Sequence, residues 1–274
     1  MDPLSLVEKN FILTGLKENI RTDGRSKLEI RPVHITLHRN GTQSSVEVEF
    51  GETKVVCIIV ADVTAPFGDR SNEGLIQFNV KFSPMAGREF SENESTEIQS
   101  ELVKVLERSI RESDAVDIEA LCIIPGEKVF SLNCSITVLD NRGNLTDACV
   151  LATTACLSHY RRPDYSVEAG VVTIYSTDDR DPIPLSIHHQ PICITFGIFD
   201  NDLFILDPNE REEQVQKGSI SFILNAFGEL CGIHKLGGIP MGQQDLINCA
   251  QIAATKVLDI SKLLIQTLKD SDKA

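Results

Sequence analysis

Residues 129–162 read VFSLNCSITVLD, NRGNLTD and then ACVLATTACLSHYRR, and the rest of the chain is organised around this stretch. In its first part, apolar residues alternate with small or polar ones: Phe130, Leu132, Cys134, Ile136 and Val138. This period of two predicts a strand that is buried on one face. Residues 140–143 have the composition of a turn, and Thr146 is placed to cap a following helix that is rich in small residues. We expect that helix to pack closely on the sheet.

A strand, a glycine turn and a helix start together form a potential anion site, because free backbone N–H groups point outward there. The first turn of this helix, however, offers Leu145 and Asp147. A carboxylate suits the positive end of the helix dipole and would occupy it. These residues favour a self-capped structural helix, with a phosphate site as the alternative.

Composition restricts the class of protein. The chain has 274 residues, of which 42% are hydrophobic, enough for two lobes or one large domain. No apolar run approaches the roughly 20 residues of a membrane span, and we expect no secretory signal. The eight cysteines include no Cys-x-x-Cys pair, so we expect reduced thiols in a cytosolic or nuclear protein and no metal ribbon.

The net charge of −14 argues against nucleic-acid binding through the overall electrostatic field. A local basic row remains possible on the predicted helix over 91–113, which Ser91 and Glu94 would begin as a capping box. Lys104, Arg108 and Arg111 recur there at helical spacing. A solvated charged face and an RNA contact both fit this row.

The remaining pattern predicts two lobes, 1–162 and 163–274, in an α+β duplication. The first begins with a helix over 4–20, capped by Ser5 and Glu8, whose apolar face would contain Leu4, Val7 and Phe11. Its other predicted elements are a hairpin around 40–41, a strand over 55–60 buried on both faces, a loop over 63–74 and a strand over 76–82. The second lobe has predicted strands over 192–198, 203–206, 220–224 and 230–233, and a long helix over 242–269.

The densest acidic stretch, 207–213, follows an apolar strand. Asp207 and Glu213 could hold a divalent cation or act as acid and base, and a solvated turn capped by Asp207 is the simpler alternative. His188 and His189 point to opposite sides of an extended segment, which favours a structural role. The sequence contains no Ser-His-Asp elbow, P-loop or dinucleotide fingerprint.

Five motifs together resemble the RNase PH family over about residues 5–269: Arg21-x-Asp-Gly-Arg25, Arg70-x-x-Glu73-Gly74, Arg108-Ser-Ile-Arg111, Gly143-Asn-Leu-x-Asp147-Ala148 and Asp181-Pro-x-Pro-Leu-Ser-Ile-His188. Within that family the chain resembles the non-catalytic ring subunits of the RNA exosome. The resemblance implies two ββαβα-type lobes with mixed sheets and packed helices. It also implies a hetero-hexameric ring around a channel for single-stranded RNA.

Active members of the family cleave RNA from its 3′ end with phosphate as the nucleophile, and they hold that phosphate with a hydroxyl and an Arg at the helix N-terminus. Here Leu145 and Thr146 take those places, or Asn144 and Leu145 in the other register. Asp207 matches one of two family aspartates, and Glu213 replaces the other with a longer side chain. Lys104 falls where the family has a phosphate-contacting Arg, and a lysine lacks the bidentate fork.

The resemblance therefore implies a catalytically silent subunit without cofactor or metal, which supports rRNA maturation and mRNA turnover in the nucleus, nucleolus and cytoplasm. Its implied partners are other RNase PH-type subunits, S1/KH cap subunits, associated nucleases and RNA, with no membrane or DNA. Expected RNA contacts are Arg70, Lys104, Arg108 and Arg111. Two alternatives remain: an active phosphate-dependent 3′→5′ exoribonuclease, and a Mg²⁺-dependent hydrolase built on the carboxylates of 207–213.

Overall fold

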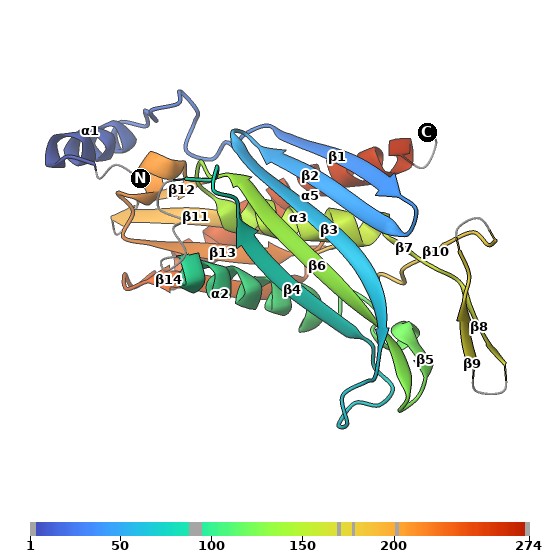
Figure 1. The fold of residues 1–274 in the computed structure, drawn as a ribbon. Coiled ribbons are helices and arrows are strands. Elements are labelled where there is room, and N and C mark those ends of the chain that lie inside the picture. The colour runs from blue at the N-terminus through green and yellow to red at the C-terminus, as the bar shows by residue number, and fades with distance from the viewer. Residues whose placement is uncertain (1–3, 88–94, 169–170, 177–178, 201–202, 272–274) are drawn as a thin grey trace.

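The computed structural model describes residues 4–87, 95–168, 171–176, 179–200 and 203–271, and contains two main sheets with helices between and behind them (Figure 1). The first sheet has the order β1-β2-β3-β6-β4, and β5 pairs with β6. All of its pairings are antiparallel except β4 with β6. Its strands are β1 (Val33–Asn40), β2 (Gln43–Phe50), β3 (Thr53–Thr64), β4 (Leu75–Phe82), β5 (Cys122–Ile124) and β6 (Lys128–Asp140). The predicted hairpin is confirmed, with Asn40 opposite Gln43.

The second sheet is antiparallel throughout, in the order β12-β11-β13-β14. Its strands are β11 (Ile192–Asp200), β12 (Leu203–Leu206), β13 (Gly218–Leu224) and β14 (Leu230–Gly237). Two small two-stranded sheets connect the main ones. They pair β7 (Arg161–Arg162) with β10 (Ile183–Pro184), and β8 (Tyr165–Glu168) with β9 (Val171–Ile174). The β8–β9 hairpin projects from the end of the molecule opposite α1 (Figure 1).

The helices are α1 (Leu6–Lys17), α2 (Ser95–Leu106), α3 (Leu145–His159), α4 (Glu210–Glu213) and α5 (Gln243–Ser271). A π-helical turn, Glu107–Arg111, continues α2, and a short 3-10 helix spans Glu119–Leu121. The predicted capping box of Ser5 and Glu8 is confirmed. The Ser91 and Glu94 box lies outside the described residues. Among the described helices, none is long and apolar enough to cross a membrane.

Two predictions about buried faces were wrong. Helix α1 buries Ile12 and Leu16, whereas Val7 and Phe11 are 78% and 72% exposed. The strand predicted over 55–60 is buried on one face only, because α3 covers one side of β3 and, in the part of the chain that the structure describes, no second layer covers the other. Its outer face carries Val60, which is 41% exposed. A continuous apolar run therefore lies on a one-sided sheet.

Helix α3 lies between the two main sheets and contacts β2, β3 and β11. Its small residues are completely buried, as predicted from the sequence: Ala148, Cys149, Ala152, Ala155 and Cys156. One continuous cluster of buried apolar side chains runs through both sheets, α3 and α5. The predicted α+β class is confirmed, and the larger of two buried apolar clusters includes side chains from both lobes. All eight cysteines are free thiols.

Gly143 stands where the turn before α3 meets the turn before α4. Its φ is +91°, and an added Cβ would lie 2.6 Å from the backbone of Asn209 and of Glu210. Gly143→Ala is therefore expected to lower the free energy of unfolding by about 2–4 kcal/mol, measured by urea denaturation. Gly68→Ala is the control, because a Cβ there meets nothing within 4 Å. Equal stability of the two variants would contradict this account of Gly143.

Candidate functional site

The candidate site forms where the start of α3 meets the turn between β12 and α4. Asn144 is the N-cap residue of α3 and has left-handed backbone angles, φ +58° and ψ +48°. Its side chain makes no capping hydrogen bond to the helix. The predicted cap, Thr146, is instead the second residue of α3, so that prediction was wrong. The α4 turn packs closely against Gly143, and the chain enters α3 through left-handed backbone angles at Asn144. The helix therefore begins at Leu145.

Asn144 connects three carboxylates. Its backbone N–H donates to Glu213 Oε1 at 2.7 Å. Its side-chain Nδ2 donates to Asp207 Oδ1 and to Asp147 Oδ2, each at 2.8 Å. The structure thus brings together the two predicted carboxylates and the predicted helix start, which are more than 60 residues apart in the chain.

Asp207 is surrounded by positively charged groups. Arg31 donates to both carboxylate oxygens, from Nε at 2.9 Å and from a guanidinium nitrogen at 2.7 Å, and its backbone N–H donates at 2.9 Å. Arg25 donates to Oδ2 at 2.7 Å. Burial alone would raise the pKa of Asp207, but the hydrogen bonds and charge of Arg31 outweigh it and hold the pKa below its ordinary value. Asp207 is therefore a fixed anion whose oxygens are occupied.

A second buried ion pair stabilises the turn between β12 and α4. Arg21 and Glu212 are both fully buried and lie 2.6 Å apart, and Arg21 also donates to the carbonyl oxygens of Leu206 and Asp207. Sequence reasoning assigned no role to Arg21, Arg25 or Arg31. The available signal was the Arg21-x-Asp-Gly-Arg25 motif, whose two arginines both reach the 206–212 turn.

The other two carboxylates behave differently. Burial raises the pKa of Asp147 to about 6 and that of Glu213 to about 7, against the opposing effect of their hydrogen bonds. The sequence suggested that Asp147 would cap α3, but in the structure it does not. It accepts hydrogen bonds from the backbone N–H and hydroxyl of Thr195 on β11, at 2.9 and 2.6 Å. It therefore ties the helix to the second sheet.

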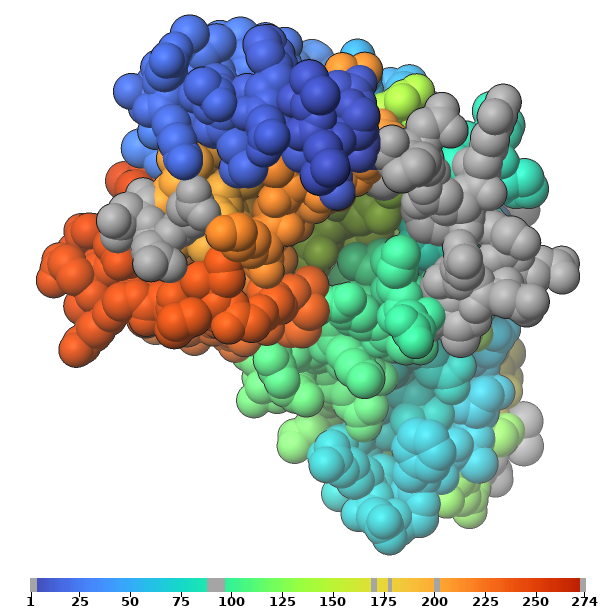
Figure 2. Space-filling model, turned by 90° about the vertical axis from the view of Figure 1, so that its left-hand side faces the viewer, coloured from blue at the N-terminus to red at the C-terminus, as the bar shows by residue number. Residues whose placement is uncertain are grey.

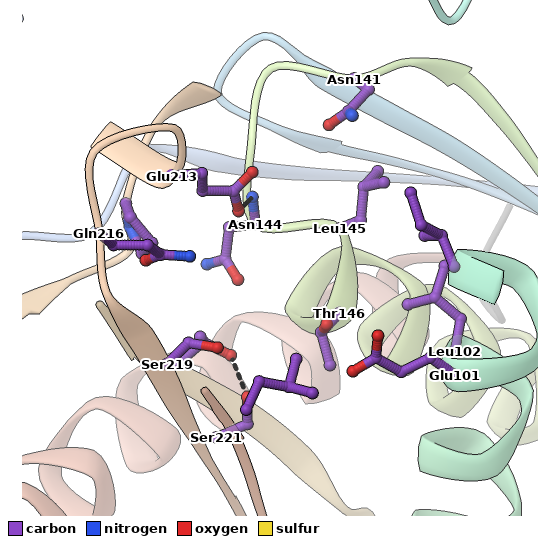
Figure 3. Close-up of a pocket in the computed structure, with 14 residues that line it drawn as sticks. Glu101, Leu102, Asn141, Asn144, Leu145, Thr146, Glu213, Gln216, Ser219 and Ser221 are labelled. Atoms are coloured by element: carbon purple, nitrogen blue, oxygen red, sulfur yellow. Dashed lines mark hydrogen bonds between the residues drawn. The ribbon is translucent and has the colours of Figure 1, made fainter. Parts of the chain in front are cut away.

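A cavity of about 290 Å³ opens beside this network, between α2 and the second sheet (Figures 2 and 3). Asn144, Leu145, Thr146 and Glu213 line it from one side, and Glu101 extends from α2 on the other. Its remaining lining residues are Ile98, Leu102, Asn141, Thr195, Pro208, Gln216, Ser219, Ser221 and Leu236. No Arg or Lys is among the described residues that line this cavity. An anion at the helix N-terminus would meet carboxylates here.

The four predicted RNA contacts do not form one row. Arg70 and Arg111 line a separate cavity, together with His188 and four carboxylates: Glu73, Asp114, Asp117 and Glu119. Arg108 turns toward β14 and donates to the carbonyl of Ile233 at 3.2 Å, and Lys104 is exposed on α2. The π-helical turn lies between Lys104 and Arg111 and changes the spacing of side chains around the helix.

Ionised Glu213 destabilises the fold because burial raises its pKa from 4.5 to about 7. Between these values the native state keeps a proton that the unfolded chain has lost, so stability falls as pH rises through this window. Glu213→Gln is expected to raise the free energy of unfolding by about 1–3 kcal/mol at pH 8 and to change it little at pH 5. Urea denaturation at both pH values measures the difference.

Glu127→Gln, on an exposed turn, is the control and should shift stability equally at both pH values. If Glu213→Gln behaved like this control, Glu213 would be ionised without cost and the raised pKa would be wrong.

Two family models match the chain. The model described as 3′ exoribonuclease family, domain 1, covers residues 29–163, and that of domain 2 covers residues 189–256. The chain is 38% identical to Exosome complex component RRP45 of Danio rerio and 37% identical to that of Homo sapiens, over 99% of its own length. It spans 69% of the zebrafish protein and 62% of the human one. Identity to the Schizosaccharomyces pombe protein of the same name is 34%, over 97% of this chain and 91% of that protein.

Solved structures agree with these relatives. The Archaeoglobus fulgidus exosome with RNA bound to the active site contains a chain that superposes with a TM-score of 0.83 at 26% identity, covering 93% of this chain and 97% of that one. A chain of an archaeal exosome core superposes with a TM-score of 0.79 at 26% identity, covering 94% and 96%. The resemblance seen in the sequence motifs is confirmed, and the chain belongs to the RNase PH family of 3′ exoribonucleases.

Proposed function

We propose that this chain is a non-catalytic subunit of the six-membered ring of an RNA exosome core, where it supports 3′-to-5′ processing and decay of RNA. The observation that carries the proposal is the state of Asp207: its two oxygens accept hydrogen bonds from Arg25, Arg31 and Asn144. A carboxylate with these partners has no free lone pair directed at a substrate, a metal ion or a proton.

The helix N-terminus also lacks the groups that phosphate requires. Anion sites combine backbone N–H groups with Arg, Lys or hydroxyl donors. Here the backbone N–H of Asn144 is already bonded to Glu213, and the buried Asp147 lies in the first turn of the helix. Phosphate would have to displace one carboxylate and approach another, so phosphorolysis at this site is strongly disfavoured.

The Mg²⁺-dependent hydrolase is disfavoured for the same reason. A hard cation binds carboxylate oxygens that are free to turn toward it. Asp207 is bound to two guanidinium groups, and Glu213 accepts a hydrogen bond from the backbone N–H of Asn144 while burial raises its pKa to about 7. Within the described residues, no group of three His, Cys, Asp or Glu side chains is placed to hold a metal.

The names of the relatives, all exosome complex components, support a ring assembly for this chain. We propose partners of the same fold in a hetero-hexamer, S1/KH cap subunits and associated nucleases, with single-stranded RNA in the channel. The proposed locations are the nucleus, including the nucleolus, and the cytoplasm. A net charge of −14 suits a subunit whose main contacts are with proteins.

The decisive assay follows phosphate-dependent release of nucleoside diphosphates from end-labelled single-stranded RNA by the purified chain. No release above background is expected, and a phosphorolytic family member serves as the positive control.

The double variant Leu145→Ser, Thr146→Arg restores a hydroxyl and a guanidinium at the start of α3. It should remain inactive because Arg25 and Arg31 still hold Asp207. Losing even one stabilising group at such a site costs on the order of 10²–10³ in rate. Diphosphate release by the wild-type chain would establish the enzyme alternative.

RNA contact is tested in the reconstituted ring by nuclease protection of threaded RNA. Charge reversal of Arg70 with Arg111, or of Lys104 with Arg108, is expected to weaken protection and to reduce the salt dependence of binding by about one unit per lost phosphate contact. Reversal of Lys262 and Lys269, exposed on α5, is the matched control. Unchanged protection in either test pair would remove that pair from the RNA path.

A further inference from the structure

We propose that the cavity beside α3 binds a guanidinium or primary ammonium group carried on an aliphatic chain, in the place where a phosphate site would be expected. This inference goes beyond the ring-subunit function and does not depend on it. It rests on two buried acceptors without partners, on the charges that face the cavity, and on its apolar walls.

The first acceptor is the amide oxygen of Asn144, a residue that is 2% exposed. Asn144 Nδ2 donates to two carboxylates, Asp207 and Asp147. Because only the amide nitrogen can donate, this pairing fixes which end of the amide is which. Oδ1 must therefore face away from both carboxylates, toward the cavity, and it is buried without a hydrogen-bond partner.

A second buried oxygen without a partner, Gln216 Oε1, belongs to a residue that lines the same cavity, and it lies against Gly197 of β11. Ser219 and Thr146 add hydroxyl groups to its wall (Figure 3). Buried acceptors that lack donors are costly, and they are stabilised when a ligand supplies N–H groups. Inorganic phosphate is an anion at neutral pH and presents mainly acceptor oxygens, so it would bring negative charge beside Glu101 and Glu213 and would satisfy buried amide oxygens poorly.

The carboxyl groups on the cavity walls also favour a cation. Glu101 reaches into the cavity from α2 and Glu213 from α4, so opposite walls each carry a carboxyl group. Glu101 is also bonded at 3.0 Å to His234 of β14. A cation placed between two carboxylates in a partly enclosed cavity gains far more than it would in bulk water.

Apolar side chains make up the rest of the wall and would contact the methylene groups of such a ligand. They are Ile98, Leu102, Leu145, Pro208 and Leu236. The volume of about 290 Å³ admits a chain of several carbons with a polar head. Lysine and arginine side chains have this form, as do small diamines and guanidino amines.

The ligand chemistry has two sources, a free small cation or the side chain of a protein partner. Isothermal titration of the full chain with agmatine, at pH 8 and physiological salt, measures the first. An end-capped Gly-Arg-Gly peptide measures the second. Tighter binding of agmatine would indicate the free cation, and equal or tighter binding of the peptide would indicate the side chain. Inorganic phosphate is expected to give no saturable heat.

Two variants assign the binding to this cavity. Glu101→Gln removes one charge, and Gln216→Met removes one acceptor at nearly constant volume. Each is expected to weaken agmatine binding roughly tenfold or more. Glu97→Gln makes the same charge change one helical turn earlier, at an exposed residue outside the cavity lining, and should change affinity by less than about twofold.

Two substitutions at Thr146 test the cavity by thermal unfolding, without added ligand. Thr146→Arg places a guanidinium at the cavity wall, so it should raise Tm, whereas Thr146→Glu should lower Tm. Thr146→Arg should also abolish agmatine binding in the titration.

The proposal is overturned if agmatine and the peptide give no saturable heat, if phosphate binds more tightly than either, or if Glu101→Gln and Gln216→Met leave the affinity unchanged. A Tm that rises with Glu and falls with Arg at position 146 would also overturn it.

Discussion

The ion pairs between Asp207 and the guanidinium groups of Arg25 and Arg31 determine much of this structure. They join the segment before β1 to the turn after β12, which lies 176 residues after Arg31 and 182 after Arg25. Through Asn144, the same carboxylate reaches the first turn of α3. Charged groups buried this deeply are stable only when every partner is present. The start of α3, the α4 turn and the N-terminal segment are therefore held in one arrangement, and that arrangement occupies the carboxylate that catalysis would need.

The same network changes the electrostatics of the neighbouring cavity. Asn144 uses its donors on carboxylates and directs its remaining acceptor outward. A site that begins as the positive end of a helix thus becomes a surface of oxygen atoms. Within the described residues, Asn144 accounts for both the lack of a phosphate cradle and the cation preference that we propose, because an amide has only two N–H donors and a backbone has one.

Sequence patterns predicted the longer strands of the two main sheets and the long helices, because alternation with a period of two or 3.6 reports directly on one-sided burial. They did not predict the short strands β5 and β7 to β10. They failed where a tertiary contact decided the outcome. The start of α3 shifted from the position predicted by Thr146 because the α4 turn packs against Gly143. The apolar run at 55–60 could not reveal that only one face of its sheet is covered. For the site, the spacing of Asp207 and Glu213 identified the carboxylates, but their hydrogen-bond partners lie far away in the chain, and no local period connects them.

Helix α3 belongs to the first lobe in sequence and contacts strands of both lobes in space. When a ribosome has synthesised residues up to about 162, this helix is complete, yet the sheet that covers its other side has not been made. Its alanine and cysteine surface then has only one neighbour, and many contacts of the finished core join residues more than 40 positions apart. Such long-range contacts slow folding, since loop closure must precede them. The nascent first lobe consequently exposes the apolar surface of α3 until β11 has been made, and a folding intermediate with such a surface is prone to aggregation.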